Sequence, residues 1–327
     1  MVKSQRVLVT GATGFVGRAL VCNLIEQHFF VSALVRRENS LLPDEATKIR
    51  VADLTDLRDW QSILKNIEVV IHVAGRAHIM HDDVADPLAE FRKVNTAATL
   101  ELARQAAEAG VKRFVFISSI KVNGELTYPH PSPLPEGEGV TGCFSEDDLF
   151  VPTDPYGLSK YEAEQGLLAL AKETGMEVVI IRPTLVYGSG VKGNFSSLLK
   201  WMKKGIPLPF GAIHNQRSLV ALDNLVSFII HCIAHPKAAN EVFLISDGED
   251  VSTTELLRKV ARAFDKNPLL LPIPVSLMTL AAKLIGKGDV ANRLFGSLQV
   301  DSSKARDLLG WKPVITMDEQ LKKTAGH

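Results

Sequence analysis

The feature that most constrains the fold is an alternation of short apolar runs with helical stretches over the first two thirds of the chain. The runs have the length of β-strands and read RVLVT, FVSALV, KIRVA, VVIHVAG, RFVFISS and EVVIIRP. Strands that alternate with helices imply crossover connections and a parallel sheet covered on both faces. The sequence therefore predicts an α/β fold with a doubly wound parallel sheet of the Rossmann type.

Capping residues mark the ends of two of the crossover helices. Asp86 and Asp154 each precede a proline, which places a capping acid before a proline at the first helical position. Gly110 and Gly175 follow the two helical stretches and predict their ends.

The chain divides into a large first domain and a smaller lobe. We predict the Rossmann domain over residues 1–187 and a mainly substrate-binding lobe over residues 188–327, because glycine and proline punctuation increases after residue 188. Residues 219–246 could return to the first domain. The segment over residues 127–142 is rich in proline and glycine and is predicted to form a long surface loop.

Composition excludes several classes of protein. Lys plus Arg and Asp plus Glu both number 37, which favours neither nucleic acid nor an anionic membrane as a partner. The three cysteines lie far apart, without the spacing of a disulfide framework or a zinc site, so we expect reduced thiols and no metal. The first strand begins within a few residues of Met1, which leaves no room for a signal peptide, and we expect a cytoplasmic protein.

The most apolar later stretch is LLLPIPVSLMTLAAKLIG, which begins at Leu269. Two prolines and Lys283 interrupt it, so it is too short for a membrane span, and we expect no stable membrane insertion. We predict a core helix of the smaller lobe. The alternative is a contact with a membrane surface or a lipid substrate.

Three glycines, Gly11, Gly14 and Gly17, follow the first strand and open a helix. Glycine permits a tight turn and a close approach of backbone N–H groups to a diphosphate, and the helix N-terminus favours an anion. This pattern predicts a dinucleotide site. The alternative is a glycine turn that serves only packing.

The end of the second strand indicates which dinucleotide is bound. An acid there holds the ribose hydroxyls of NAD, whereas a basic residue suits the 2′-phosphate of NADP. Val35 stands at this position and is followed by Arg36 and Arg37, which favours NADP(H), with NAD(H) as the alternative. The arginines could instead form a solvated strand end. Asp53, after the third strand, could meet the adenine edge or cap the next helix.

A tyrosine and a lysine supply the predicted chemistry. Tyr156 and Lys160 are four residues apart, so they share one face of a helix. A phenol has a pKa near ~10, and an adjacent ammonium group favours the phenolate that acts as a base. A serine at the end of the fifth strand, Ser119 or its neighbour Ser118, could hydrogen-bond the substrate oxygen.

Motifs along nearly the whole chain resemble those of the extended short-chain dehydrogenases/reductases, the family of nucleotide-sugar epimerases, dehydratases and reductases. The matching segments are GATGFVG, DLTD, VAGRAH, KVNTAATLELARQA, ISSIKVNG, YGLSK, RPTLVYG and DSSKARDLLGWKP. The segment IKVNGE is similar to a subgroup associated with bacterial surface-polysaccharide genes.

The resemblance implies a role for each matching position. Tyr156 is implied as the general acid/base, Lys160 as its electrostatic partner and ribose anchor, and Ser119 as the group that orients the sugar oxygen. Asn194 and Arg217 are implied at the nucleoside diphosphate, with a helix cap and a surface ion pair as the respective alternatives. Lys121 adds a charge beside Ser119, close to where the substrate is expected to lie. The implied cofactor contacts, in addition to Tyr156 and Lys160, are Gly11, Ala12, Thr13, Gly14, Phe15, Val16, Gly17, Arg36, Arg37, Asp53, Leu54, Ala74, Gly75, Asn95 and Pro183.

Departures from the UDP-galactose type of epimerase direct the choice of reaction. That type has an acid, an asparagine and a tyrosine where this chain has Val35, Leu185 and Asn123. Together with the two arginines, this favours an NADP-dependent reductase of a UDP-linked 4-keto-6-deoxy-N-acetylhexosamine. The alternative is a nucleotide-sugar 4-epimerase with tightly bound NAD, and another class is a dinucleotide sensor without catalysis. The resemblance also implies a homodimer formed through the helices near residues 95–110 and 155–173.

Overall fold

The computed structural model describes residues 5–37, 41–56, 59–76, 86–128, 140–148, 150–191, 207–284, 286 and 288–326. Its main feature is a seven-stranded parallel sheet with the strand order β11-β8-β5-β4-β1-β2-β3. The strands are β1 (Arg6–Thr10), β2 (Phe30–Val35), β3 (Thr47–Arg50), β4 (Val69–His72), β5 (Arg113–Ile117), β8 (Glu177–Pro183) and β11 (Glu241–Ile245). The prediction of a doubly wound α/β fold is confirmed.

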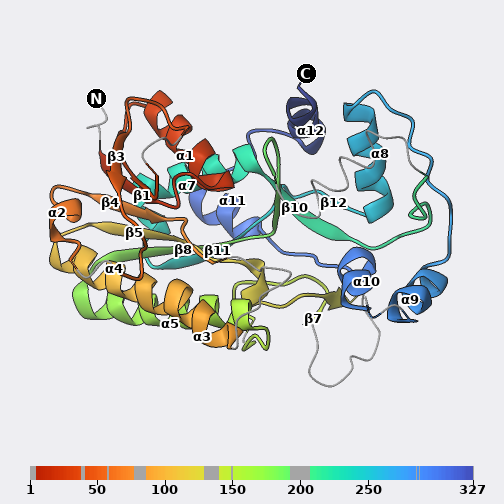
Figure 1. Ribbon diagram of the computed structural model, residues 1–327, viewed down its shortest axis with the longest axis horizontal. Coiled ribbons are helices and arrows are strands. Elements are labelled where there is room, and N and C mark those ends of the chain that lie inside the picture. The colour runs from red at the N-terminus through yellow and green to blue at the C-terminus, as the bar shows by residue number, and fades with distance from the viewer. Residues whose placement is uncertain are drawn as a thin grey trace.

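Helices cover both faces of this sheet (Figure 1). One face carries α1 (Phe15–Glu26), α7 (Leu222–Ala234) and α11 (Ser303–Leu309), which share an apolar core with the strands. The other face carries α2 (Gln61–Leu64), α4 (Ala98–Glu108) and α5 (Pro155–Thr174). Strand β11 and helix α7 both belong to this layered domain, although they follow the first residues of the smaller lobe in sequence.

The expected helix ends agree with the structure. Asp86 accepts a hydrogen bond from Ala89 N at the start of α3 (Pro87–Phe91), and Asp154 accepts one from Gly157 N at the start of α5. Gly110 and Gly175 have φ of 80° and 76°, in the left-handed region that ends a helix. A π-helical turn, Arg92–Ala97, joins α3 to α4.

The smaller lobe is built around a second sheet with the order β12-β10-β9. Its strands are β9 (Leu185–Tyr187), β10 (Arg217–Ala221) and β12 (Asp250–Val251), and helices α8 (Thr253–Ala263) and α12 (Met317–Ala325) contribute to the core beside them. The segment over residues 127–142, predicted to be a long loop, includes a short strand pair at its ends, β6 (Thr127–Tyr128) and β7 (Val140–Thr141), and its residues 129–139 lie outside the described ranges.

The prediction of a core helix in the apolar stretch from Leu269 is wrong. Leu208 exchanges backbone hydrogen bonds with Leu269 and Leu271, so the chain before Pro274 is extended and the helix, α9 (Val275–Leu284), begins only afterwards. This helix contains no buried residue and packs on α10 (Gly288–Phe295) at the rim of the lobe (Figure 1). None of the helices in the described ranges has the length and apolar character needed to cross a bilayer.

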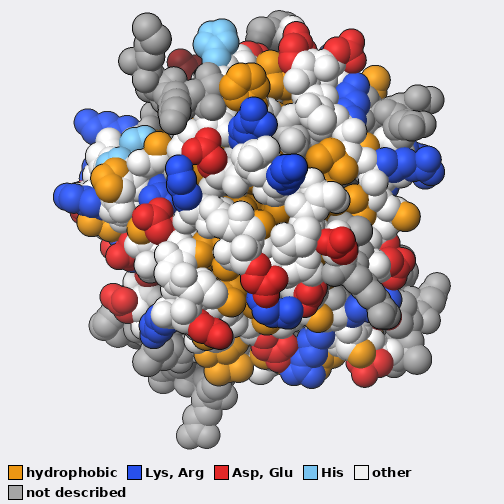
Figure 2. Space-filling view, turned by 90° about the vertical axis from the view of Figure 1, so that its left-hand side faces the viewer, with side chains coloured by type: hydrophobic (Ala, Val, Ile, Leu, Met, Phe, Trp, Pro, Cys, Tyr) orange, Lys and Arg blue, Asp and Glu red, His pale blue; other side chains and the backbone are white. Residues whose placement is uncertain are grey.

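Charge is distributed evenly over the surface that Figure 2 displays. On the described part of this face, which belongs to the Rossmann domain, basic and acidic side chains lie interspersed. This distribution agrees with the equal totals of acidic and basic residues in the sequence.

Candidate active site

The glycine turn lies at the point where the strand order reverses, because β1 has β2 on one side and β4 on the other. Gly11 has φ of 65°, and a Cβ there would lie 2.7 Å from Ala74 N. A Cβ on Gly17 would clash with the Gly11 carbonyl. No side chain caps the N-terminus of α1 at Gly14. The turn therefore fits a diphosphate, which binds to backbone N–H groups at a helix N-terminus in such a crevice.

The end of β2 presents basic side chains beyond a buried strand. Val35 is buried, whereas Arg36 and Arg37 are exposed. Asp53 accepts hydrogen bonds from Thr55 N (2.8 Å) and Thr55 Oγ1 (2.9 Å). The backbone N–H of Thr55 lowers the pKa of Asp53, and the charge of Arg36 adds to this shift. Asp53 is thus part of a local turn, and the adjacent Leu54 packs against the core.

Tyr156, Ser119 and Lys160 come together where β5 ends and α5 begins. Ser119 follows β5 and caps a short 3₁₀ turn, and Tyr156 lies in the first turn of α5. Burial raises the pKa of Tyr156, its hydrogen bond with Ser119 lowers it, and the Asp154 carboxylate raises it. The Tyr156 ring packs edge-on against Phe91, with 5.8 Å between centroids. Ser119, rather than Ser118, therefore contacts the phenol.

Lys160 is held below Tyr156 on the same face of α5. Its side chain is almost fully buried, and Nζ donates to the Ile117 carbonyl at 2.9 Å. Nζ also lies 4.5 Å from the centroid of the Phe116 ring. Burial lowers the pKa of Lys160 to about 8, and the Glu164 carboxylate opposes the shift. The amine therefore keeps its positive charge near neutral pH, one helical turn after Tyr156 on α5.

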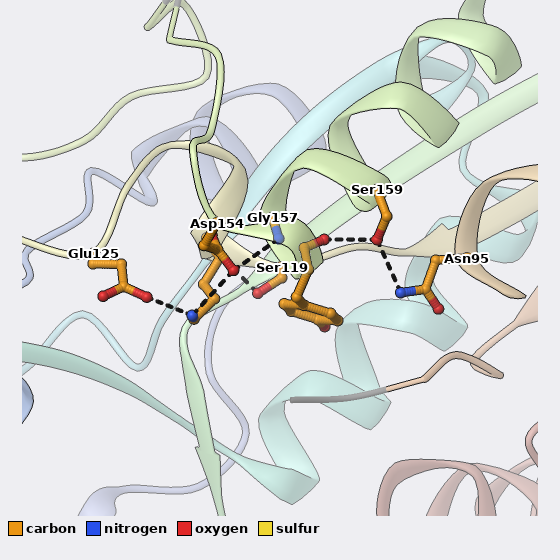
Figure 3. Close-up of polar contacts among 8 residues, drawn as sticks. Asn95, Ser119, Glu125, Asp154, Gly157 and Ser159 are labelled. Carbon is orange, nitrogen blue, oxygen red and sulfur yellow. Dashed lines mark hydrogen bonds and ion pairs between the residues drawn. The ribbon is translucent and has the colours of Figure 1, made fainter. Parts of the chain in front are cut away.

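Asn95 joins this helix to the loop after β4. Asn95 Nδ2 donates to Ser159 Oγ at 3.0 Å (Figure 3). Nδ2 also donates to the Arg76 carbonyl at 3.1 Å, and Oδ1 accepts from Arg76 N at 2.8 Å. A Cβ on Gly75 would lie 3.2 Å from both Asn95 Oδ1 and Lys160 Nζ. Because Gly75 has no side chain, the loop after β4 can lie close to Lys160. Asn95 holds this loop in place through its hydrogen bonds with Arg76.

Lys121 follows Ser119 and forms two ion pairs. Its Nζ lies 2.5 Å from Glu125 Oε1 and 3.4 Å from Asp154 Oδ1, the carboxylate that caps α5 (Figure 3). Lys121 thus links the turn that carries Ser119 to the helix that carries Tyr156.

A buried ion pair beneath the site was not predicted from the sequence. Arg182, on β8, donates to both carboxylate oxygens of Glu164, with its closest contact at 2.6 Å. Glu164 also accepts a hydrogen bond from the Ser118 hydroxyl. Arg182 Nη1 donates to Asn123 Oδ1 at 3.0 Å. Glu164 follows Lys160 by four residues, so the helical spacing that groups Tyr156 with Lys160 could have identified it.

His72 is a second buried group that sequence reasoning missed. Its Nδ1 lies 2.8 Å from Thr10 Oγ1 and its Nε2 lies 3.0 Å from Thr99 Oγ1. Thr10 Oγ1 also accepts from Ala74 N at 3.2 Å, next to the glycine turn. Burial, with a smaller contribution from the charge of Lys160, lowers the pKa of His72 to about 3. A histidine within an otherwise apolar strand is the sequence signal for this network.

This depressed pKa makes a testable contribution to acid sensitivity. The unfolded chain binds a proton at His72 below about pH 6.5, whereas the folded protein resists protonation down to about pH 3. The free energy of unfolding should therefore fall with decreasing pH across this window, by about 2 kcal/mol between pH 7 and pH 5 from this residue. We expect His72→Gln to remove that part of the fall in urea titrations at both pH values. The exposed His214→Gln should retain it, and an equal pH dependence in His72→Gln and wild type would contradict the assignment.

Pro183 and Arg217 lie near the border of the two sheets. Pro183 is buried at the end of β8, opposite Ile245 of β11. Arg217, at the start of β10, donates from Nη1 to the Gly296 carbonyl at 3.1 Å, and burial lowers its pKa. Asn194 lies outside the described residues. Among the described residues, no group of three or more His, Cys, Asp or Glu side chains could hold a metal ion.

Comparisons with known proteins agree with this geometry. Residues 7–246 match the family model of the NAD dependent epimerase/dehydratase family. The chain is 52% identical over 324 residues to a Vibrio cholerae protein named UDP-glucose 4-epimerase, with 98% of this chain and 94% of the relative covered. The structure of a Thermotoga maritima UDP-glucose 4-epimerase with UDP-glucose matches with a TM-score of 0.75 at 27% identity, covering 98% of each chain. MoeE5 in complex with UDP-glucuronic acid and NAD gives the same values.

A doubly wound sheet, a glycine turn at its switch point and a Ser–Tyr–Lys group at the end of β5 define an extended short-chain dehydrogenase/reductase. The chain belongs to the NAD-dependent epimerase/dehydratase family, and it is an NAD(P)-dependent enzyme. The resemblance identified from the sequence is confirmed at this level.

Proposed function

We propose that this enzyme is a 4-epimerase of a UDP-linked hexose that retains its dinucleotide through the catalytic cycle. The observation that carries the proposal is the 52% identity, over 98% of the chain, to a protein named UDP-glucose 4-epimerase. This supports the epimerase better than the reductase that the sequence motifs favoured. The 4-keto sugar reductase remains the second candidate, because Arg36 and Arg37 are exposed at the end of β2.

Tyr156 is the proposed acid and base at the oxygen of carbon 4. Ser119, which hydrogen-bonds the phenol, would hold that oxygen within reach of Tyr156. The positive charge of Lys160 favours the phenolate, which removes the hydroxyl proton in the oxidation half and returns it in the reduction half. A dinucleotide held at the glycine turn would supply the hydride acceptor for carbon 4 and then the hydride donor, and carbon 4 is inverted when the keto sugar presents its opposite face for the return.

The choice between the two reactions depends on whether the dinucleotide stays bound. An epimerase must keep its reduced cofactor while the keto sugar is present, whereas a reductase exchanges its cofactor in every cycle. Native mass spectrometry of the purified protein should therefore reveal a bound dinucleotide. An empty protein that binds NADPH only when it is added would overturn the epimerase and support the reductase.

The arginine pair is proposed to contact a 2′-phosphate. We expect Arg36→Ser/Arg37→Ser to weaken NADPH binding by about tenfold or more, because two charge-assisted hydrogen bonds are lost. Binding of NADH should stay within about twofold of wild type, since both side chains are exposed and contribute little to the fold. Titration of the dinucleotide-free protein measures both affinities. Equal losses for NADPH and NADH, or no loss, would place the arginines away from the 2′ position.

Other assignments extend the same proposal to the smaller lobe and to assembly. Arg217 and Asn194 are proposed to contact the nucleoside diphosphate, and Lys121 to face the sugar. The proposed homodimer would pair α4 and α5 of one subunit with the same helices of another. In the single chain these two helices already pack together, with Leu100 of α4 against Gly166 of α5.

A further inference from the structure

Helix α9 presents an unusual apolar face to solvent. Leu277, Leu280 and Leu284 are 57%, 57% and 80% exposed. Their spacing of three and four residues places them on one side of the helix. In the extended segment before α9, Leu269 and Leu271 are also exposed, whereas Leu270 between them pairs with Leu208. We refer to Leu269, Leu271, Leu277, Leu280 and Leu284 together as the leucine face.

The leucine face is concentrated rather than scattered. Its five members are half of the ten large hydrophobic side chains that are exposed in the described parts of the chain. All five fall within sixteen consecutive residues, 269–284. Single exposed leucines are ordinary on protein surfaces, but a cluster of this kind marks an interaction site.

The charges around the leucine face identify the partner. Residues 265–289 contain three lysines, Lys266, Lys283 and Lys287, and two aspartates, Asp265 and Asp289, which stand at the two ends of the segment. The rest of the chain balances this local excess, since the formal net charge is zero. Helix α9 itself carries Lys283 and no acid, and an apolar helix face beside a lysine suits the surface of a bilayer that contains anionic lipids. A second copy that packed its α9 against this one would oppose Lys283 to Lys283, because α9 has no acid to pair with it.

The leucine face also connects to the proposed substrate site. Helix α9 packs on α10, and α10 leads directly to Gly296, whose carbonyl accepts the hydrogen bond from Arg217. The next residue, Ser297, accepts a backbone hydrogen bond from Thr127 of β6.

We infer that α9 and the segment before it dock this enzyme on the surface of an anionic bilayer, with the leucine face in the headgroup region. The inference does not depend on which sugar reaction the enzyme performs.

Flotation of the full-length protein with lipid vesicles tests the inference. We expect the protein to float with vesicles of phosphatidylcholine and phosphatidylglycerol, and less with phosphatidylcholine alone. Leu277→Asp/Leu280→Asp should lower the partition coefficient by more than about tenfold, because two apolar contacts are lost and two negative charges are added. Lys283→Gln should lower it by about fivefold. Leu41→Asp is the matched control, since Leu41 is 78% exposed but lies in the Rossmann domain.

Two further measurements keep the outcome decisive. The thermal unfolding midpoint of Leu277→Asp/Leu280→Asp should match that of the wild type, because both leucines are exposed. Absence of flotation for the wild-type protein, or equal flotation of the wild type and Leu277→Asp/Leu280→Asp, would overturn the inference. A sedimentation mass that falls from dimer to monomer in this variant, without vesicle binding by the wild type, would assign the leucine face to a second copy instead.

Discussion

Tyr156→Phe is expected to lower kcat by about 10²- to 10⁴-fold, the usual contribution of a positioned acid and base. The phenol is the group at this site that hydrogen-bonds Ser119, and the substitution removes only its hydroxyl. The ring remains to pack against Phe91, so the fold and the cofactor site should be preserved. Steady-state turnover and dinucleotide titration of the same preparation measure the two effects separately.

Tyr161→Phe provides the matched control for this experiment. Tyr161 lies on the same helix, outside the group formed by Tyr156, Ser119 and Lys160, and its replacement should leave kcat within about twofold of wild type. Full turnover by Tyr156→Phe would refute the catalytic assignment. A simultaneous loss of dinucleotide binding would instead assign Tyr156 to the cofactor site alone.

Arg182→Met is expected to lower the free energy of unfolding by about 3–5 kcal/mol. The side chains of Arg182 and Glu164 are 7% and 1% exposed, so removal of the arginine leaves a buried carboxylate without its cation. Chemical denaturation followed by circular dichroism measures the change. The loss should be large because the carboxylate must either stay charged in the core or take up a proton.

Two further variants separate the buried pair from a general effect of arginine removal. Arg182→Met/Glu164→Gln removes both charges and should recover part of the lost stability. Arg306→Met breaks an exposed ion pair with Asp307, where both side chains are at least 60% exposed, and should cost less than about 1 kcal/mol. A cost for Arg182→Met no greater than that for Arg306→Met would show that the buried pair does not support the fold.

The layered sheet could be predicted from the sequence because its strands are buried on both faces. Such strands read as continuous apolar runs, and β1, β2 and β8 match the predicted segments residue for residue. The turn at Gly11 and the helical pair Tyr156 and Lys160 were equally accessible, because their function depends on local spacing. The family assignment followed from these local motifs and is supported by the match over residues 7–246.

Features that depend on long-range packing could not be predicted. The apolar stretch from Leu269 reads as a core helix, but its prolines hold the first part extended and leave α9 at the rim. The contact of Glu164 with Arg182 joins α5 to β8, and that of His72 with Thr10 joins β4 to β1. Such partners depend on strand order and register, which a residue pattern does not specify.

The most direct test of the proposed epimerase is to incubate the purified protein with UDP-glucose and, separately, with UDP-N-acetylglucosamine, without added cofactor. Nuclear magnetic resonance of the sugar protons would follow inversion at carbon 4. We expect one of these substrates to reach an equilibrium mixture with its 4-epimer, because the hydride is returned within the same site. If neither sugar changes, but the protein oxidises added NADPH while it reduces a UDP-linked 4-keto sugar, the enzyme is a reductase and the epimerase proposal is wrong.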